Sequence, residues 1–376
     1  MKKKDRVWRA LHRESCDRFP VFTSATPQFL AAILGTGSRA PTPRESWQHC
    51  IDLHLDVVQA GHPSFYPVRV MELENGDKYV DRMNRTHVIA GYYDEFCEPF
   101  ALESEAKGDP EEIKDSWDAF EFPDPHDDAW FTGMREITHA NRQLQDPLSI
   151  WGVINGPLEP TWQLIGDSWT FFFIMARRNE QLAREILDRT CEYCIEAGKA
   201  MIEHGADAIR IGDDYALNDG LMVHPERWKS LIYPAHVKLV QGLKKFAGSD
   251  YPVILHSDGN ITSIIPWLLQ GGIDALNPIQ PGALDFQEIM EKWGNHFALA
   301  GAFDLRFFLE PPVEPTFTRL HEEVERLMGI ALAFHGEPTG FCIGPSHQVQ
   351  PASYPITFTR WVECVHQLNR KIEEIQ

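Results

Sequence analysis

The sequence predicts an α/β protein whose parallel strands close into a TIM-type (β/α)8 barrel, with an open doubly wound sheet as the alternative. Three observations predict this class. Short apolar runs rich in β-branched residues recur along the chain, most are followed by a helical pattern, and polar residues stand where the runs end. Such runs are typical of strands buried on both faces of a parallel sheet. A total of eight strand–helix units suggests a closed barrel.

The clearest strand lies in the stretch 251–259. Pro252 precedes the apolar run Val253–Leu255, and His256 follows it at once. Counting from the N-terminus, the other expected strands are Phe19–Phe22, Phe65–Glu72, Ser149–Asn155, Ala206–Asp214, Ile273–Gln280, His296–Gly301 and Gly340–Gly344. The whole chain, residues 1–376, is therefore expected to form a single barrel domain.

Helical spacing of apolar residues connects these strands. The expected helices are 9–13, 46–59, 161–175, 179–204, 225–246, 261–269, 286–293, 316–334 and a last one after Tyr354. In the N-terminal third, alternating residues around the turn signal Asn75-Gly76 predict a β-hairpin insertion over 79–93. Residues 101–128 are acidic and rich in proline, and are expected to be a surface loop that partly serves as a lid.

Composition and charge exclude several classes of protein. The formal net charge of -20 argues against a nucleic-acid-binding face, which needs a basic stripe. The basic start Met1–Asp5 is not followed by an apolar core, so it is no secretory signal, and the longest apolar runs are too short to span a bilayer. Seven cysteines without disulfide-scaffold spacing fit a reducing cytoplasm, and the pair Cys191 and Cys194 is expected to consist of ordinary helix residues.

Polar side chains recur where the predicted strands end, and in a barrel these positions converge on one mouth. The set comprises Asn155, Asp213, Asp214, His256, Asp258, Gln280, Asp304, Ser346 and His347. Of these, Asp213, Asp214, His256 and His347 are the candidate catalytic residues. In an alternating strand only one of Asp213 and Asp214 faces the mouth, and the other faces the helix layer.

His256, Asp258 and His347 together offer two imidazoles and a carboxylate from two strand ends. This is an acceptable three-ligand set for a catalytic zinc with one position left open. The alternative is a pocket without metal, in which the two histidines make hydrogen bonds or do acid–base work. Cys342 lies within the last strand and is expected in the core.

Further residues near the same edge are candidates for substrate binding. Arg210 alternates with two isoleucines and would need a carboxylate partner or an anionic substrate if it points into the barrel. Trp162 and Tyr215 would suit a flat or hydrophobic substrate. Asn155 and Gln280 add polar groups at two strand ends.

Several motifs, in this order and spacing, resemble the uroporphyrinogen decarboxylase superfamily. They are Asp17-Arg-Phe-Pro-Val, Gly156-Pro157, Gly205-Ala-Asp-Ala-Ile with Gly212-Asp-Asp214, His256-Ser-Asp-Gly259, Gly272 to Gln280, Gly301-Ala-Phe-Asp304 and Gly344-Pro-Ser-His347. The resemblance covers nearly the whole chain and implies a (β/α)8 barrel with its site at the carboxyl mouth. True uroporphyrinogen decarboxylases carry Arg-Gln-Ala-Gly-Arg after the first strand. This chain has Thr23 to Leu30 there, without arginine, so haem biosynthesis is rejected as its function.

The superfamily's second branch, methyltransferases that work with methylcobamides, is more similar. Its members hold zinc through His-x-Cys and a later Cys, and the zinc turns an acceptor thiol into a thiolate. Here His256 matches the histidine, Asp258 stands at the first cysteine, and His347 stands about where the second would be. This harder set suits an oxygen ligand better. The resemblance therefore implies a methyltransferase that demethylates an O-methyl or N-methyl compound onto a corrinoid carried by a separate protein, and family habit suggests a homodimer.

Two other functions compete with methyl transfer. One is a decarboxylase or lyase acting on a smaller carboxylic acid, with Asp213 or Asp214 and His347 as proton donors and no corrinoid. The other is a barrel without catalysis, which would have no reason to gather His256, Asp258 and His347 at one edge. Dependence on a corrinoid separates the first two.

Overall fold

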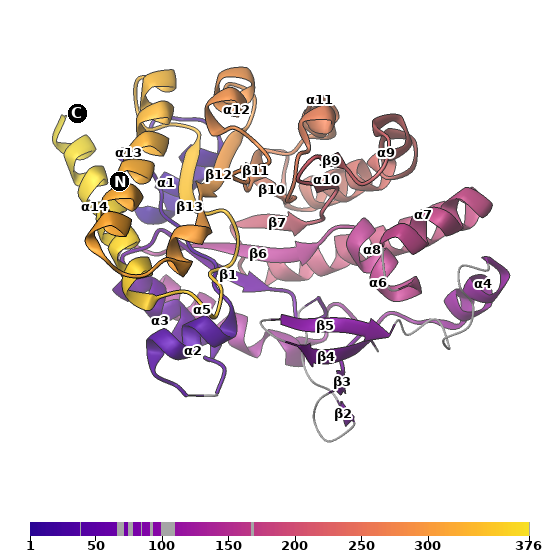
Figure 1. The fold of residues 1–376 in the computed structure, drawn as a ribbon. Coiled ribbons are helices and arrows are strands. Elements are labelled where there is room, and N and C mark those ends of the chain that lie inside the picture. Colours follow the sequence, from indigo (N-terminus) through magenta and orange to yellow (C-terminus); the bar gives the residue numbers. More distant parts are fainter. Residues whose placement is uncertain are drawn as a thin grey trace.

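The computed structural model describes residues 1–37, 39–65, 71–73, 78–83, 85–90, 93–98, 110–166 and 169–375. Seven parallel strands form one curled sheet in the order β1-β6-β7-β10-β11-β12-β13 (Figure 1). They are β1 (Val57–Gly61), β6 (Ser149–Asn155), β7 (Ala208–Gly212), β10 (Val253–His256), β11 (Ala275–Asn277), β12 (Ala298–Phe303) and β13 (Phe341–Pro345). Neighbours in space follow one another in the sequence among these strands, as the predicted βα alternation requires.

The segment around Val21 closes the sheet into a barrel. Val21 pairs in parallel with Ile343 of β13, and its carbonyl accepts a hydrogen bond of 2.8 Å from the amide of Asp56, next to β1. The expected first strand is therefore the eighth stave, although it is too short to count as a full strand. The predicted TIM-type barrel is confirmed.

The predicted strand Phe65–Glu72 was wrong, because the stave after Val21 is β1. Residues 66–70 lie outside the described residues, and Met71 begins a strand of a different sheet. The predicted helix 46–59 also ran too far, since α3 (Pro43–Asp52) ends at Asp52 and His54 has a positive φ of 54°. Leu55 and Val58 continued the helical spacing by coincidence, since both are also buried around a strand.

Most helices follow strands and cover the outside of the barrel, and the first helix closes its amino end (Figure 1). They are α1 (Lys3–Leu11), α2 (Pro27–Leu34), α3, α4 (Pro110–Ala119), α5 (Thr132–Arg142), α6 (Leu158–Ile165), α7 (Trp169–Arg178), α8 (Glu180–Glu203), α9 (Pro225–Leu231), α10 (Tyr233–Ala247), α11 (Ile265–Gly271), α12 (Phe286–Trp293), α13 (Glu314–His335) and α14 (Pro355–Ile375). Two predicted helices are each split in two. The break between α6 and α7 falls at Gly166. The break between α9 and α10 lies just before Pro234, which sits in the first turn of α10, where a backbone N–H has no partner within the helix and proline is therefore tolerated.

The N-terminal third carries a second sheet. The alternating pattern predicted only a β-hairpin over 79–93, and the structure has a larger sheet in this region. Its four antiparallel strands are β2 (Met71–Leu73), β3 (Lys78–Val80), β4 (Thr86–Ala90) and β5 (Tyr93–Glu98). Of the acidic segment, residues 101–109 lie outside the described residues. Its continuation in α4 packs on α8, where Arg189 donates to the carbonyl of Trp117 at 2.8 Å and lies over the Trp117 ring.

The interior of the barrel is filled at its amino end. Val7, Ala10 and Leu11 of α1 join one buried cluster with Trp151 of β6 and Cys342 of β13. Cys342 is therefore a core residue, as expected. Cys191 and Cys194 are free and buried in α8, and burial raises the pKa of both thiols. Because α1 fills the amino end, the carboxyl ends of the strands form the mouth. In the described parts of the chain, no helix is long and apolar enough to cross a membrane.

A buried ion-pair network holds the closure of the barrel. The Asp56 carboxylate accepts hydrogen bonds from Arg6 at 2.7 Å, from both terminal nitrogens of Arg18 at 2.9 Å and from the Val21 amide at 2.9 Å. Arg6 also binds Asp17 at 2.6 and 2.7 Å. The Asp17-Arg18 motif thus ties α1, the first stave and β1 together.

Replacing Asp56 by alanine should therefore destabilise the fold strongly. Arg6 would lose a partner in a buried site, and removing one member of such a pair typically costs about 3–5 kcal/mol. Equilibrium unfolding in urea measures this loss. Asp219→Ala, at an exposed position, is the control and should change the free energy of unfolding by less than about 0.5 kcal/mol. Equal effects of the two substitutions would contradict the proposed role of Asp56.

Candidate functional site

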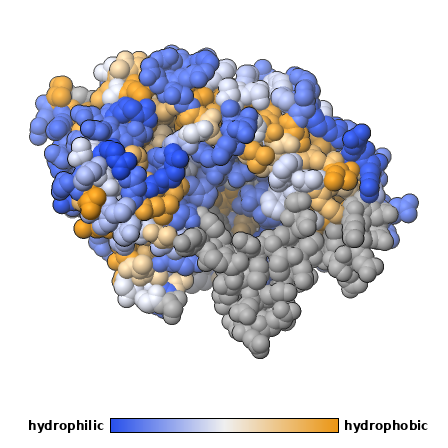
Figure 2. All heavy atoms as spheres, in the orientation of Figure 1, coloured by the Kyte–Doolittle hydropathy of each residue, from blue (hydrophilic) through white to orange (hydrophobic). Residues whose placement is uncertain are grey.

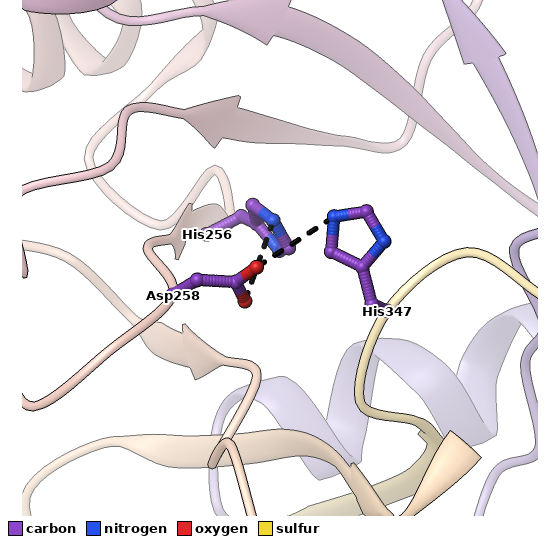
Figure 3. Close-up of side chains that lie close together, drawn as sticks. All are labelled: His256, Asp258 and His347. Atoms are coloured by element: carbon purple, nitrogen blue, oxygen red, sulfur yellow. Dashed lines mark ion pairs between the residues drawn. The ribbon is translucent and has the colours of Figure 1, made fainter. Parts of the chain in front are cut away.

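His256, Asp258 and His347 meet at the mouth of the barrel (Figure 3). His256 is the last residue of β10, Asp258 follows two residues later, and His347 stands two residues beyond β13. The Asp258 carboxylate lies 4.0 Å from Nε2 of His256 and 3.6 Å from Nε2 of His347. One ligand atom from each residue lies within 4.8 Å of the other two. The structure thus brings together the three residues that the sequence grouped, and their role as metal ligands stays a prediction.

Asn277 orients the His256 ring from the next strand. Its side-chain nitrogen donates to the carbonyl of Ala300 at 3.0 Å, so its oxygen faces the imidazole and lies 2.6 Å from Nδ1 of His256. Nδ1 therefore carries the proton, and the lone pair of Nε2 points toward Asp258. A ligating histidine commonly has such a hydrogen-bonded partner behind it. Arg210 donates to the same Asn277 oxygen at 3.2 Å.

The protonation states of the three residues suit a cation. Burial lowers the pKa of His256 well below its usual value, and burial also lowers that of His347. Burial raises the pKa of Asp258 to about 6, against the effect of Arg210. At pH 7 the imidazoles are neutral and most of the carboxylate is ionised, which are the forms that bind metal.

One oxygen of Asp258 supports the same conclusion. Oδ1 of Asp258 is buried and has no hydrogen-bond partner among the described residues. An unsatisfied buried polar atom is costly, and a cation held with the two imidazoles would satisfy it. The donor set of nitrogen and oxygen atoms fits zinc. The residues present therefore fit the predicted metal.

The neighbouring Asp213 and Asp214 face opposite ways, as the alternation of a strand predicts. Asp213 is fully buried and accepts hydrogen bonds from the amides of Leu158 and Glu159 at 3.2 and 2.8 Å, at the start of α6. Asp214 accepts from the Asp258 amide at 2.9 Å and so faces the mouth. Burial raises the pKa of Asp213 to about 7 and that of Asp214 to about 6.

Glu159 is a residue of this site that the sequence reasoning missed. It lies in the first turn of α6, where an acidic residue is ordinary because it complements the helix dipole, and so gave no functional signal. Its carboxylate accepts from Gln163 at 3.1 Å, and Gln163 in turn accepts from Arg85, the residue directly before β4. Burial and the charges of Asp214 and Asp213 raise the pKa of Glu159 to about 8.

The residues predicted to bind substrate have different positions. Arg210 lies in the cluster, 3.2 Å from Nδ1 of His256. Gln280 holds the loop after β10, since its oxygen accepts from the Gly259 amide at 2.6 Å. Tyr215 is buried behind the mouth, where its hydroxyl donates to Asp213 at 2.9 Å. Asn155 ends β6 and Trp162 lies half-buried in α6. Their contact with substrate stays a prediction.

A protein-family model described as uroporphyrinogen decarboxylase (URO-D) matches residues 107–368, which is more than half of the chain. The chain belongs to the uroporphyrinogen decarboxylase family. Family membership agrees with the resemblance that the strand-end motifs carry, and the site described above occupies the carboxyl mouth of this family's barrel.

Two kinds of relative are found within this family. The chain is 28% identical to the methylcobamide:CoM methyltransferase MtbA of Methanosarcina mazei over 146 residues, which cover 39% of this chain and 41% of that protein. It is 25% identical to a uroporphyrinogen decarboxylase of Pseudomonas fluorescens over 265 residues, 68% of this chain and 69% of that one. The match therefore spans about two fifths of the methyltransferase. The solved structure of a methyltransferase from Methanosarcina mazei superposes with a TM-score of 0.67 at 18% identity, covering 98% of this chain and 99% of that chain, and confirms the fold.

The raised pKa of Glu159 predicts how stability changes with pH. The pKa rises from 4.5 to about 8 on folding, so the native state holds this proton more tightly than the unfolded state. The free energy of unfolding should therefore fall as the pH rises from 4.5 to 8. In Glu159→Gln this part of the decrease should be absent, which urea unfolding at several pH values measures. An unchanged slope in the variant would show that Glu159 titrates normally.

Proposed function

We propose that the protein is a methyltransferase that moves a methyl group between a small O-, N- or S-methyl compound and a corrinoid protein, with zinc at the barrel mouth. The observation that supports this most is the cluster of His256, Asp258 and His347, whose ligand atoms lie within 4.8 Å of one another in a chain similar to methylcobamide:CoM methyltransferases. The proposal includes a separate corrinoid protein as partner.

A zinc held by these three residues would act as a Lewis acid on the heteroatom of the substrate and leave one coordination position open. The other residues act on binding and orientation. Asn277 fixes the His256 ring, and Arg210 places a positive charge beside the cluster. The Asp258 carboxylate and the two imidazoles form a harder set than thiolates, which favours an oxygen ligand over a sulfur ligand. This favours demethylation of an O-methyl or N-methyl compound as the direction of transfer.

Metal content tests the proposed site. Protein purified without chelator should hold about one zinc per chain, and His256→Ala should lose it, because a three-ligand site seldom keeps zinc after losing one ligand. Elemental analysis of dialysed protein measures both. His335→Ala is the control, because His335 ends α13, away from the mouth, and it should keep the metal. Absence of metal in the unsubstituted protein would rule out the zinc site.

Methyl transfer itself is tested with a corrinoid. The protein is mixed with reduced cobalamin and a series of small O-, N- and S-methyl compounds, and the loss of the Co(I) absorption is followed. At least one compound should react with the unsubstituted protein, and its rate should fall at least about 100-fold in Asp258→Asn. Losing the carboxylate charge would weaken both the binding of the metal and the activation of the substrate by the metal. Equal rates with and without enzyme for every compound would contradict corrinoid-dependent transfer.

The alternative is a decarboxylase or lyase acting on a small carboxylic acid. It is favoured by the carboxyl of Glu159, which keeps its proton at pH 7 because its pKa is raised to about 8. Such a group suits proton donation to a carbanion. Release of carbon dioxide without any corrinoid would favour this alternative.

A further inference from the structure

A cavity of about 160 Å³ lies beside the mouth, between α2, α3, the first stave, β1 and β6. Thr23, Gln59 and Gly61 line it from the carboxyl ends of the first stave and β1. Gln348 lines it too, and is the residue directly after His347. We call it the α2–α3 cavity. In Figure 1, α2 and α3 lie next to each other beside the start of β1, and Figure 2 shows the face with the mouth hollowed near its centre.

The lining of the α2–α3 cavity carries no charge. None of the residues described around it is Asp, Glu, Lys or Arg. Burial lowers the pKa of His49, so its ring is neutral at pH 7, and burial raises the pKa of Cys50 to about 12, so its thiol stays protonated. The cavity therefore differs from the mouth next to it, where Asp258, Arg210 and His347 lie together. An ionised group without a partner would be strongly disfavoured in the cavity.

Polar side chains of α3 line one wall of the α2–α3 cavity. Ser46, His49 and Cys50 stand at positions i, i+3 and i+4 of α3, so they share the helix face that lines it. His49 is 8% exposed, and its Nε2 is buried without a hydrogen-bond partner among the described residues. Leu30, Val58 and Val153 supply apolar walls. A ligand here would gain apolar contact, and a turn of the His49 ring toward the cavity would add one hydrogen bond to Nε2.

Its volume sets the size of the ligand. A cavity of about 150 Å³ lined by apolar side chains holds benzene, so 160 Å³ holds a group of about the size of a six-membered ring. Such a group would reach the mouth through the neighbourhood of Gln348 and His347, which are consecutive in the chain.

We propose that the α2–α3 cavity is a subsite for the non-reacting end of the substrate, and that it takes an uncharged group of ring size with one hydrogen-bonding atom directed at His49. This inference rests on the proposed function and narrows its substrate class. It excludes substrates whose non-reacting end is a carboxylate, sulfonate or phosphate. The lone pair or N–H of His49 supplies specificity, and Ser46 sets the space available.

Binding of phenol tests the subsite without metal, corrinoid or turnover. Ligand-observed NMR titration of the full chain at pH 7 should give a dissociation constant on the order of 1 mM, as expected for so small a ligand. Benzamide should bind and benzoate, which has the same shape with a charge, should bind at least about tenfold more weakly. Ser46→Leu, which fills the cavity, should weaken phenol binding at least about tenfold, and His49→Phe should weaken it on the order of threefold to tenfold through the lost hydrogen bond.

The matched control is His335→Phe, since Nε2 of His335 is also buried without a described partner but lies at the end of α13. It should bind phenol like the unsubstituted protein, and thermal unfolding of every variant shows that it is folded. If Ser46→Leu does not fold, the phenol affinities of His49→Phe and His335→Phe still test the proposal. Absence of phenol binding, equal binding of benzoate, or equal effects of the two histidine substitutions would overturn the proposal. Because phenol binding needs no metal or corrinoid, its result can be interpreted even if the methyl-transfer assay fails.

Discussion

The closure of the barrel depends on the Asp56 carboxylate, because this one group joins the first stave to β1 and to α1. On one side, Val21 bridges Ile343 of β13 and Ala25 bridges Val349, and on the other side the Asp56 carboxylate accepts a hydrogen bond from the Val21 amide. It binds Arg6 from α1 and Arg18 from the turn before the stave. A charged group buried at this depth is tolerated because its hydrogen bonds are all charge-assisted or go to backbone. The closed mouth, and so the distance from His347 to Asp258, follows from this closure.

The mouth gathers more carboxylates than cations. Asp214, Asp258 and Glu159 lie near one another, with Arg210 among them, and burial raises the pKa of each carboxyl. A site that held no cation would leave this excess of acid to be relieved by protonation. The same excess is favourable for a divalent ion. The α2–α3 cavity next to it has no charged residue in its lining, so in the proposed subsite selection by size would take place apart from the charged cluster.

The sequence predicted the fold class and the grouping of His256, Asp258 and His347, because in a barrel the end of each apolar run must lie at the same rim. It failed where the signal was not local. Val58 continued a helical spacing although it belongs to β1, and Glu159 looked like an ordinary first-turn residue of a helix. Asn277 stood inside an apolar run, and its partner His256 is 21 residues away. The α2–α3 cavity joins five segments, which no spacing in one segment predicts.

Because α1 fills the amino end of the barrel, a ligand of the barrel interior would enter from the carboxyl end. Val7 and Leu11 are buried with the small side chains of the barrel interior, and the strands' carboxyl ends form the remaining access. A small molecule lodged in the α2–α3 cavity would then lie beneath any macromolecule that covers the rim. Such an arrangement imposes a compulsory order of addition: the small molecule enters first, the macromolecule caps it, and neither product escapes until the cap has dissociated. The duration of a catalytic cycle would then be set by the lifetime of that complex.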